Sequence, residues 1–185
     1  MQRTRSVQKL TTAALLIAIG IIIPMFSPLK ILIEPASFTL ASHVAVMLAM
    51  FISPGVAGAV AVGTTLGFFF GGFPIVIVLR AATHVVWAVL GSLWLSRHPG
   101  TLSSPAKSQL FSLVLGLVHG ALEFIVVSMF YLGGTGGSNF LYSVLLLVGV
   151  GSVVHSMVDF LIALIIAKAL SRNTMINALF INANN

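Results

Sequence analysis

The sequence predicts an all-α integral membrane protein, folded as a compact bundle of six transmembrane helices with both termini cytoplasmic. Of its 185 residues, 58% are hydrophobic and only 6% are charged, whereas a soluble domain carries roughly 25% charged residues. The apolar residues form long runs that prolines, glycines and polar stretches separate. Since a membrane-spanning helix needs about 20 apolar residues, a chain of this length allows six or seven spans and no second domain.

Prolines and turn residues divide the chain into its expected elements. Pro24 and Pro28 should end the first apolar run, because proline cannot continue a helical hydrogen-bond ladder. A polar loop is expected from Ser27 to Ser37. The six helices are expected at residues 10–26, 38–52, 56–70, 75–95, 109–132 and 140–170. Residues 1–185 then form a single transmembrane domain, with a short basic N-terminal segment (1–9) and a polar C-terminal tail (171–185).

Basic residues fall unevenly on the two ends of the expected bundle. Lys30 is on the end opposite the termini, and the end that holds the termini carries Arg3, Arg5, Lys9, Arg97, Lys107, Lys168 and Arg172. Positive side chains collect on the cytoplasmic side of membrane proteins, so both termini are expected there. Because these residues are scattered, the net charge of +6 does not indicate a nucleic-acid partner.

Small residues at every fourth position predict close helix packing. The expected third helix has such a ridge from Gly55 through Ala59, Gly63 and Gly67 to Gly71, and Ala14 and Ala18 make a shorter one in the first helix. The alanine ridge could dock within the bundle or onto another subunit.

Ionisable side chains within the expected spans are the main functional hypothesis, because charges at membrane depth are costly and usually face a cavity or a partner. His43 is one of them, and three pairs spaced four apart each share a helix face: Arg80 and His84, His119 and Glu123, His155 and Asp159. From the helical rise of about 1.5 Å per residue, Arg80, His84 and Glu123 should lie around one outward-facing cavity. His119 and Asp159 should lie deeper.

These residues leave two interpretations open. Arg80 offers a planar, charged fork that suits a carboxylate on a small ligand, but it could instead form an internal ion pair with Glu123. The histidines could likewise bind a ligand or only satisfy neighbouring polar groups. No metal, cofactor or catalytic residue is expected, since the chain lacks cysteines, HExxH and GxSxG and its polar groups should be spread across the membrane depth.

The chain as a whole resembles the S components of group II energy-coupling factor (ECF) transporters, the membrane subunits that bind vitamins. The resemblance rests on SFTLASHVAVMLAMFISP (37–54), FPIVIVLRAATHVVWAVLGSL (73–93) and the spacing of Ala14 and Ala18. It implies a multi-pass protein of the bacterial cytoplasmic membrane that binds a water-soluble vitamin with high affinity and is not an enzyme. The implied partners are a membrane-embedded coupling subunit, which meets Ala14 and Ala18, and two cytoplasmic ATPases that complete an ABC importer.

Mapped by position, the resemblance nominates six residues for substrate binding: Arg80, His84, His43, Met47, Glu123 and Asn139. Arg80 favours a carboxylate vitamin, either pantothenate or nicotinate. Pyridoxine, hydroxymethylpyrimidine and cobalamin stay open, because Glu123 could already neutralise Arg80. Outside the family, the alternatives are a solitary proton-coupled carrier, with a relay of ionisable residues across the bilayer, and a membrane-embedded metalloenzyme.

Overall fold

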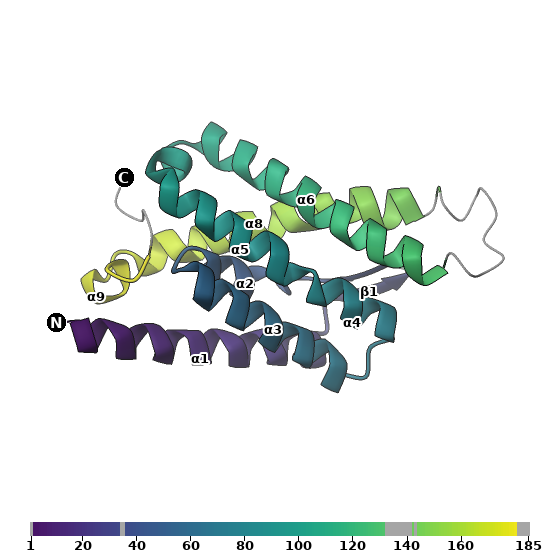
Figure 1. Ribbon diagram of the computed structural model, residues 1–185, viewed down its shortest axis with the longest axis horizontal. Coiled ribbons are helices and arrows are strands. Elements are labelled where there is room, and N and C mark those ends of the chain that lie inside the picture. Colours follow the sequence, from purple (N-terminus) through teal and green to yellow (C-terminus); the bar gives the residue numbers. More distant parts are fainter. Residues whose placement is uncertain (1, 34–35, 132–141, 143, 181–185) are drawn as a thin grey trace.

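The computed structural model describes residues 2–33, 36–131, 142 and 144–180, and its long helices lie side by side along one axis (Figure 1). In chain order the helices are α1 (Gln2–Phe26), α2 (Val44–Met50), α3 (Pro54–Phe70), α4 (Ile75–Ala82), α5 (His84–Arg97), η1 (Pro99–Leu102), α6 (Pro105–Tyr131), η2 (Leu145–Val150), α8 (Gly151–Leu170) and α9 (Thr174–Asn177).

Four segments of the described chain are long and apolar enough to cross a membrane: Ser6–Phe26, Ile75–Arg97, Pro105–Tyr131 and Leu145–Leu170. The apolar α3 is shorter, at 17 residues, or about 25 Å. The chain is therefore a predominantly helical, multi-pass membrane protein.

The segment between α1 and α3 differs from the expected polar loop and helix. β1 (Lys30–Ile33) and β2 (Ala36–Thr39) pair as an antiparallel hairpin, in which β-branched and aromatic residues such as Ile31 and Phe38 favour extended backbone. A turn follows, and α2 has only seven residues, about 10 Å of helix. The expectation of a helix over 38–52 is therefore wrong at its start, and α2 alone is too short to cross a bilayer.

Other elements also differ from the expectation. α1 starts within the basic segment but ends at Phe26, as expected, with Pro24 inside its last turn; helices in membrane proteins tolerate proline where neighbouring groups satisfy the freed carbonyl. The expected helix 75–95 divides at Thr83, whose hydroxyl donates to the Arg80 carbonyl oxygen at 2.7 Å. The last span begins with a π-helical turn, η2, before α8.

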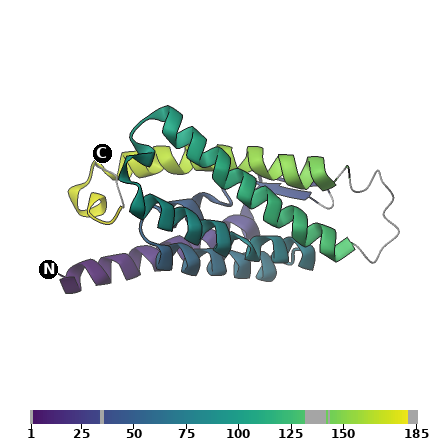
Figure 2. The same ribbon diagram turned by 45° about the horizontal axis from the view of Figure 1, so that its top comes forward.

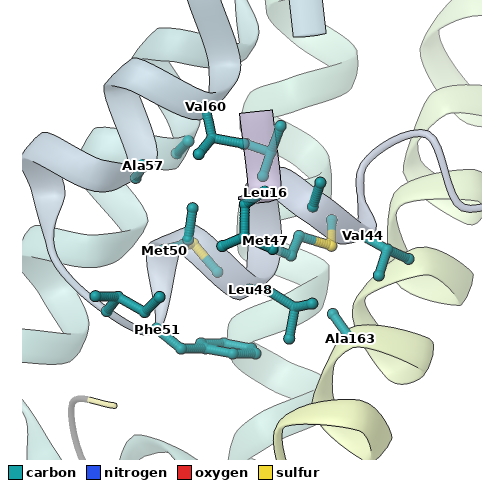
Figure 3. Packing of buried hydrophobic residues seen from close by; sticks show 14 of the residues in the cluster. Leu16, Val44, Met47, Leu48, Met50, Phe51, Ala57, Val60 and Ala163 are labelled. Atoms are coloured by element: carbon teal, nitrogen blue, oxygen red, sulfur yellow. The ribbon is translucent and has the colours of Figure 1, made fainter. Parts of the chain in front are cut away.

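The hydrophobic core surrounds α2, in which every residue is buried. Figure 3 shows Met47, Met50 and Phe51 packed among side chains of α1, α3 and α8, including Leu16 and Ala163. The hairpin and α2 thus carry the chain into the middle of the bundle, where the turn between them meets the surrounding helices.

Two glycines of the predicted ridge pack α3 tightly against α1. A Cβ atom at Gly67 would lie 2.6 Å from the Ile21 Cα, and one at Gly63 would lie 2.6 Å from Ile17 Cγ2. Gly55, by contrast, has open space around it. The prediction of close packing is therefore confirmed for the middle of the ridge and not for its start.

The first turn of α1 and helix α9 lie at the same end of the bundle (Figure 2). The segment after α8 is not simply a polar tail, because Leu179 is buried and Phe180 packs against the core. These two contacts hold the C-terminal part of the described chain beside the other helices rather than away from them.

Candidate functional site

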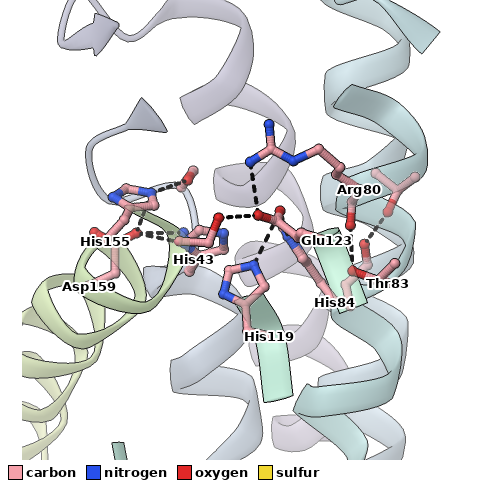
Figure 4. Close-up of polar contacts among 12 residues, drawn as sticks. His43, Arg80, Thr83, His84, His119, Glu123, His155 and Asp159 are labelled. Atoms are coloured by element: carbon pink, nitrogen blue, oxygen red, sulfur yellow. Dashed lines mark hydrogen bonds and ion pairs between the residues drawn. The ribbon is translucent and has the colours of Figure 1, made fainter. Parts of the chain in front are cut away.

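Seven ionisable side chains from five elements meet at one place inside the bundle (Figure 4). They come from the turn before α2, from α4, from α5, from α6 and from α8: His43, Arg80, His84, His119, Glu123, His155 and Asp159. All are buried except His155, which is intermediate. The expectation that these polar groups are spread apart is wrong, because the turn before α2 reaches into the bundle and brings His43 against His84, His119, His155 and Asp159.

Glu123 is contacted by polar groups from four helices, α4, α5, α6 and α8. Arg80 Nη2 donates to its Oε2 atom at 2.8 Å, and the Ser152 hydroxyl donates to the same oxygen. The other oxygen, Oε1, lies 3.3 Å from His119 Nε2 and 3.6 Å from His84 Nε2. The internal ion pair between Arg80 and Glu123 is therefore formed in this structure.

Asp159 organises the turn before α2. Its Oδ1 accepts the Ala41 backbone N–H at 3.0 Å, and its Oδ2 accepts the His43 backbone N–H at 3.0 Å and the His43 Nδ1 hydrogen at 3.1 Å. Ala41 has a φ of 66°, a left-handed conformation that is uncommon outside glycine. These three bonds hold the turn and fix the orientation of the His43 ring.

The imidazole rings pack against one another around His43. Its centroid lies 4.7 Å from those of His84 and His119 and 4.8 Å from that of His155, all in edge-on arrangements. The fully buried Trp87 closes one side, 5.3 Å from the His119 ring. The cluster thus has an aromatic wall as well as polar groups.

A small cavity adjoins the cluster. Its lining includes His43, Arg80, His84, Glu123 and His155, together with hydroxyls of β2, the following turn and α8: Ser37, Thr39, Ser42 and Ser152. Its volume is about 20 Å³, room for roughly one water molecule. A ligand larger than water must therefore displace part of this lining, and β2 with its turn contributes three of the hydroxyl residues.

Four of the six nominated binding residues line this cavity: Arg80, His84, His43 and Glu123. Met47 does not. It lies one helical turn beyond His43 and packs in the hydrophobic core, because the turn directs His43 towards Asp159 while α2 is buried on all sides. Asn139 lies outside the described residues.

Sequence reasoning missed the hydroxyl residues of the site. Ser152 lies three residues before His155 and seven before Asp159, a spacing that places all three on one face of a helix. Ser42 precedes His43 directly, and its Oγ lies 3.3 Å from His155 Nε2. The first pattern was available in the sequence, whereas the second contact depends on the turn.

A membrane-spanning helical bundle that encloses a small polar cavity with aromatic walls is suited to binding a small solute within the bilayer. No family model and no solved structure matches the chain. The chain is 44% identical over 169 residues to the niacin transporter NiaX of Lactococcus lactis subsp. cremoris (strain MG1363), a match that covers 90% of this chain and 76% of that relative. The chain belongs to the S-component family of ECF vitamin transporters.

Proposed function

We propose that this chain is the high-affinity nicotinate-binding subunit of an ECF-type ABC importer. The observation that supports this proposal most directly is that Arg80 is buried at the wall of the cavity, beside aromatic rings. The chain that carries it is a relative of a niacin transporter. A guanidinium has five N–H donors, so Arg80 can hold Glu123 and a ligand carboxylate together. Charge-assisted bonds of this kind are stronger than neutral ones.

The shape of the site favours a small, flat vitamin. The pyridine ring of nicotinate matches a cavity lined by Phe68 and the imidazoles of His43, His84 and His155, because aromatic rings pack well face to edge. The cavity of about 20 Å³ must enlarge even for nicotinate, and far more for cobalamin. We propose that the hairpin and the turn at 40–43 move outwards to admit the ligand, because they cover the cavity without being spanning helices. Pantothenate is the second candidate.

The proposed topology has six crossings and cytoplasmic termini. α1, α3, α4 with α5, α6 and η2 with α8 provide five passes, and the hairpin with α2 provides the remaining one. In support, the first turn of α1 and α9 share one end of the bundle (Figure 1), which requires an even number of passes. Basic residues lie at that end, as expected for the cytoplasmic side: Arg97 at the end of α5, Lys107 in the first turn of α6 and Arg172 just after α8.

The proposed partners are a membrane-embedded coupling subunit and two ATPases that hydrolyse ATP on behalf of this non-enzymatic subunit. Ala14 and Ala18 are exposed on α1, whereas Ala13 and Leu16 face the bundle. Exposed small residues allow another helix to approach closely. This placement supports docking onto a second subunit over packing within the bundle.

Calorimetry on the purified chain, without ATP or a pH gradient, tests the proposal. We expect tight one-to-one binding of nicotinate and weaker or no binding of pantothenate, pyridoxine, hydroxymethylpyrimidine and cobalamin. Preference for another vitamin would refute nicotinate as the substrate, and binding of none of these compounds by the folded protein would refute the S-component role.

The carrier alternative predicts pH-driven uptake by the isolated chain in liposomes. His84, Glu123, His155 and Asp159 gather in one cluster, which disfavours a relay across the bilayer.

A further inference from the structure

Two buried histidines have ring nitrogens without hydrogen-bond partners. Both nitrogens of His84 and both of His119 are in this state, although the Nε2 atoms lie near Glu123 Oε1, at 3.6 and 3.3 Å. A buried polar atom left unpaired lowers the stability of the fold. An ion or ligand that is bound in the working protein is one explanation for such atoms.

Three histidines each direct one ring nitrogen towards a carboxylate. Nδ1 of His43 bonds Asp159, and the Nε2 atoms of His84 and His119 face Glu123. Histidines that bind metals have this arrangement, because the carboxylate fixes the ring and makes the other nitrogen more basic. The other nitrogens are Nε2 of His43 and Nδ1 of His84 and of His119. Figure 4 shows His43 and His119 between the two carboxylates.

The three rings are close enough to share one ion. One ligand atom from each of His43, His84 and His119 lies within 4.8 Å of the others. Zinc–nitrogen bonds of about 2.0–2.1 Å in a tetrahedron place ligand atoms roughly 3.3 Å apart, so modest side-chain movements would complete the site. A second grouping, His43, His155 and Asp159, is less suitable because the Asp159 oxygens already accept three N–H groups.

The charge of the cluster also favours a cation. With neutral imidazoles, its described charged groups are Glu123, Asp159 and Arg80, which leave one uncompensated negative charge. A bound carboxylate vitamin would add another in a poorly solvated site, which is costly. A divalent ion would neutralise both. This step rests on the proposed function, whereas the geometry of the three histidines does not.

We propose that His43, His84 and His119 bind one divalent transition-metal ion, of the class of Zn²⁺ or Co²⁺, beside the vitamin cavity. Neutral imidazole is a favoured ligand of these ions, and three protein ligands leave a fourth position for a solute. The proposal revises the expectation of no metal, which rested partly on an incorrect spread of the polar groups across the membrane.

Optical titration of the purified, chelator-treated chain with Co²⁺ alone tests the site. We expect one equivalent to bind with the visible absorption of tetrahedral cobalt and to be displaced by Zn²⁺. His84→Leu and His119→Leu, which keep side-chain volume, should weaken binding by at least about tenfold, the loss that even an outer-shell partner causes. His98→Ala is the matched control, since His98 is exposed and stacks on Trp94, and it should bind as the unmodified chain does.

The outcomes separate this inference from the proposed function. Nicotinate binding without saturable Co²⁺ or Zn²⁺ binding would overturn the metal site and leave the vitamin role intact. Metal binding without vitamin binding would support the site and refute the vitamin role. Undiminished Co²⁺ binding in both leucine variants would overturn the choice of residues. If those variants do not fold, zinc-edge X-ray absorption of the unmodified chain decides: three imidazole ligands support the site, and their absence refutes it.

Discussion

Asp159 and His43, 116 residues apart in the sequence, are joined by two hydrogen bonds to one carboxylate oxygen. The pair ties α8 to the turn that precedes α2 and sets the direction of the His43 ring. Because this turn contributes to the cavity lining, a contact that stabilises the fold also positions the candidate site.

Asp159→Asn should lower the free energy of unfolding by about 1–3 kcal/mol, because the asparagine NH₂ group would face N–H donors and leave them unpaired. Nicotinate binding should weaken as well, since His43 loses its fixed orientation. Denaturant unfolding in detergent and calorimetry measure the two effects. Ser171→Ala, which removes only an exposed hydrogen bond just after the same helix, is the control and should change neither. A fully stable Asp159→Asn variant would contradict this role.

The Arg80–Glu123 pair can be tested with a double-mutant cycle. Arg80→Met alone should destabilise the protein by about 3–5 kcal/mol, because it leaves Glu123 charged and unpaired in the interior. Arg80→Met combined with Glu123→Leu should recover most of that stability. Nicotinate binding should be lost in the single variant and should not return in the double variant, since the ligand carboxylate has no guanidinium to bind in either. Recovery of binding together with stability would show that the pair only fixes helix packing.

The composition and the proline and glycine pattern predicted the membrane class and most long helices. They did not predict the hairpin, because short β-branched and apolar runs such as 30–39 are compatible with loop, strand or helix until their partners are known. The spacing of four residues correctly placed Arg80 with His84 and His119 with Glu123 on shared faces. It could not show that His43 joins them, because that contact depends on the left-handed turn at Ala41 and on a distant carboxylate.

Close packing of α1 on α3 predicts different responses at two glycines of one ridge. Gly67→Ala should destabilise the protein by about 1–3 kcal/mol, because the added methyl group meets the backbone of Ile21 and the helices must move apart. Gly55→Ala has open space and should be neutral or slightly stabilising. Thermal unfolding of the two variants provides the comparison. Equal tolerance at both positions would refute the described helix contact.

The exposed alanines of α1 predict a separation of assembly from binding. Ala14→Trp and Ala18→Trp should block co-purification with the coupling subunit while nicotinate affinity is unchanged, because the bulky ring prevents helix approach. Leu117→Trp, at an exposed position on α6, should leave assembly intact. If the alanine variants lost vitamin binding too, the ridge would belong to the packing of the bundle.

The most direct test of the carboxylate-binding site compares nicotinate with nicotinamide by calorimetry on the same purified chain. The two compounds share a ring and nearly the same size, but only nicotinate carries the charge that Arg80 is proposed to meet. We expect nicotinamide to bind more weakly by about 2 kcal/mol or more, roughly thirtyfold in affinity. Equal affinity for both compounds, or tighter binding of nicotinamide, would contradict recognition of the vitamin through its carboxylate.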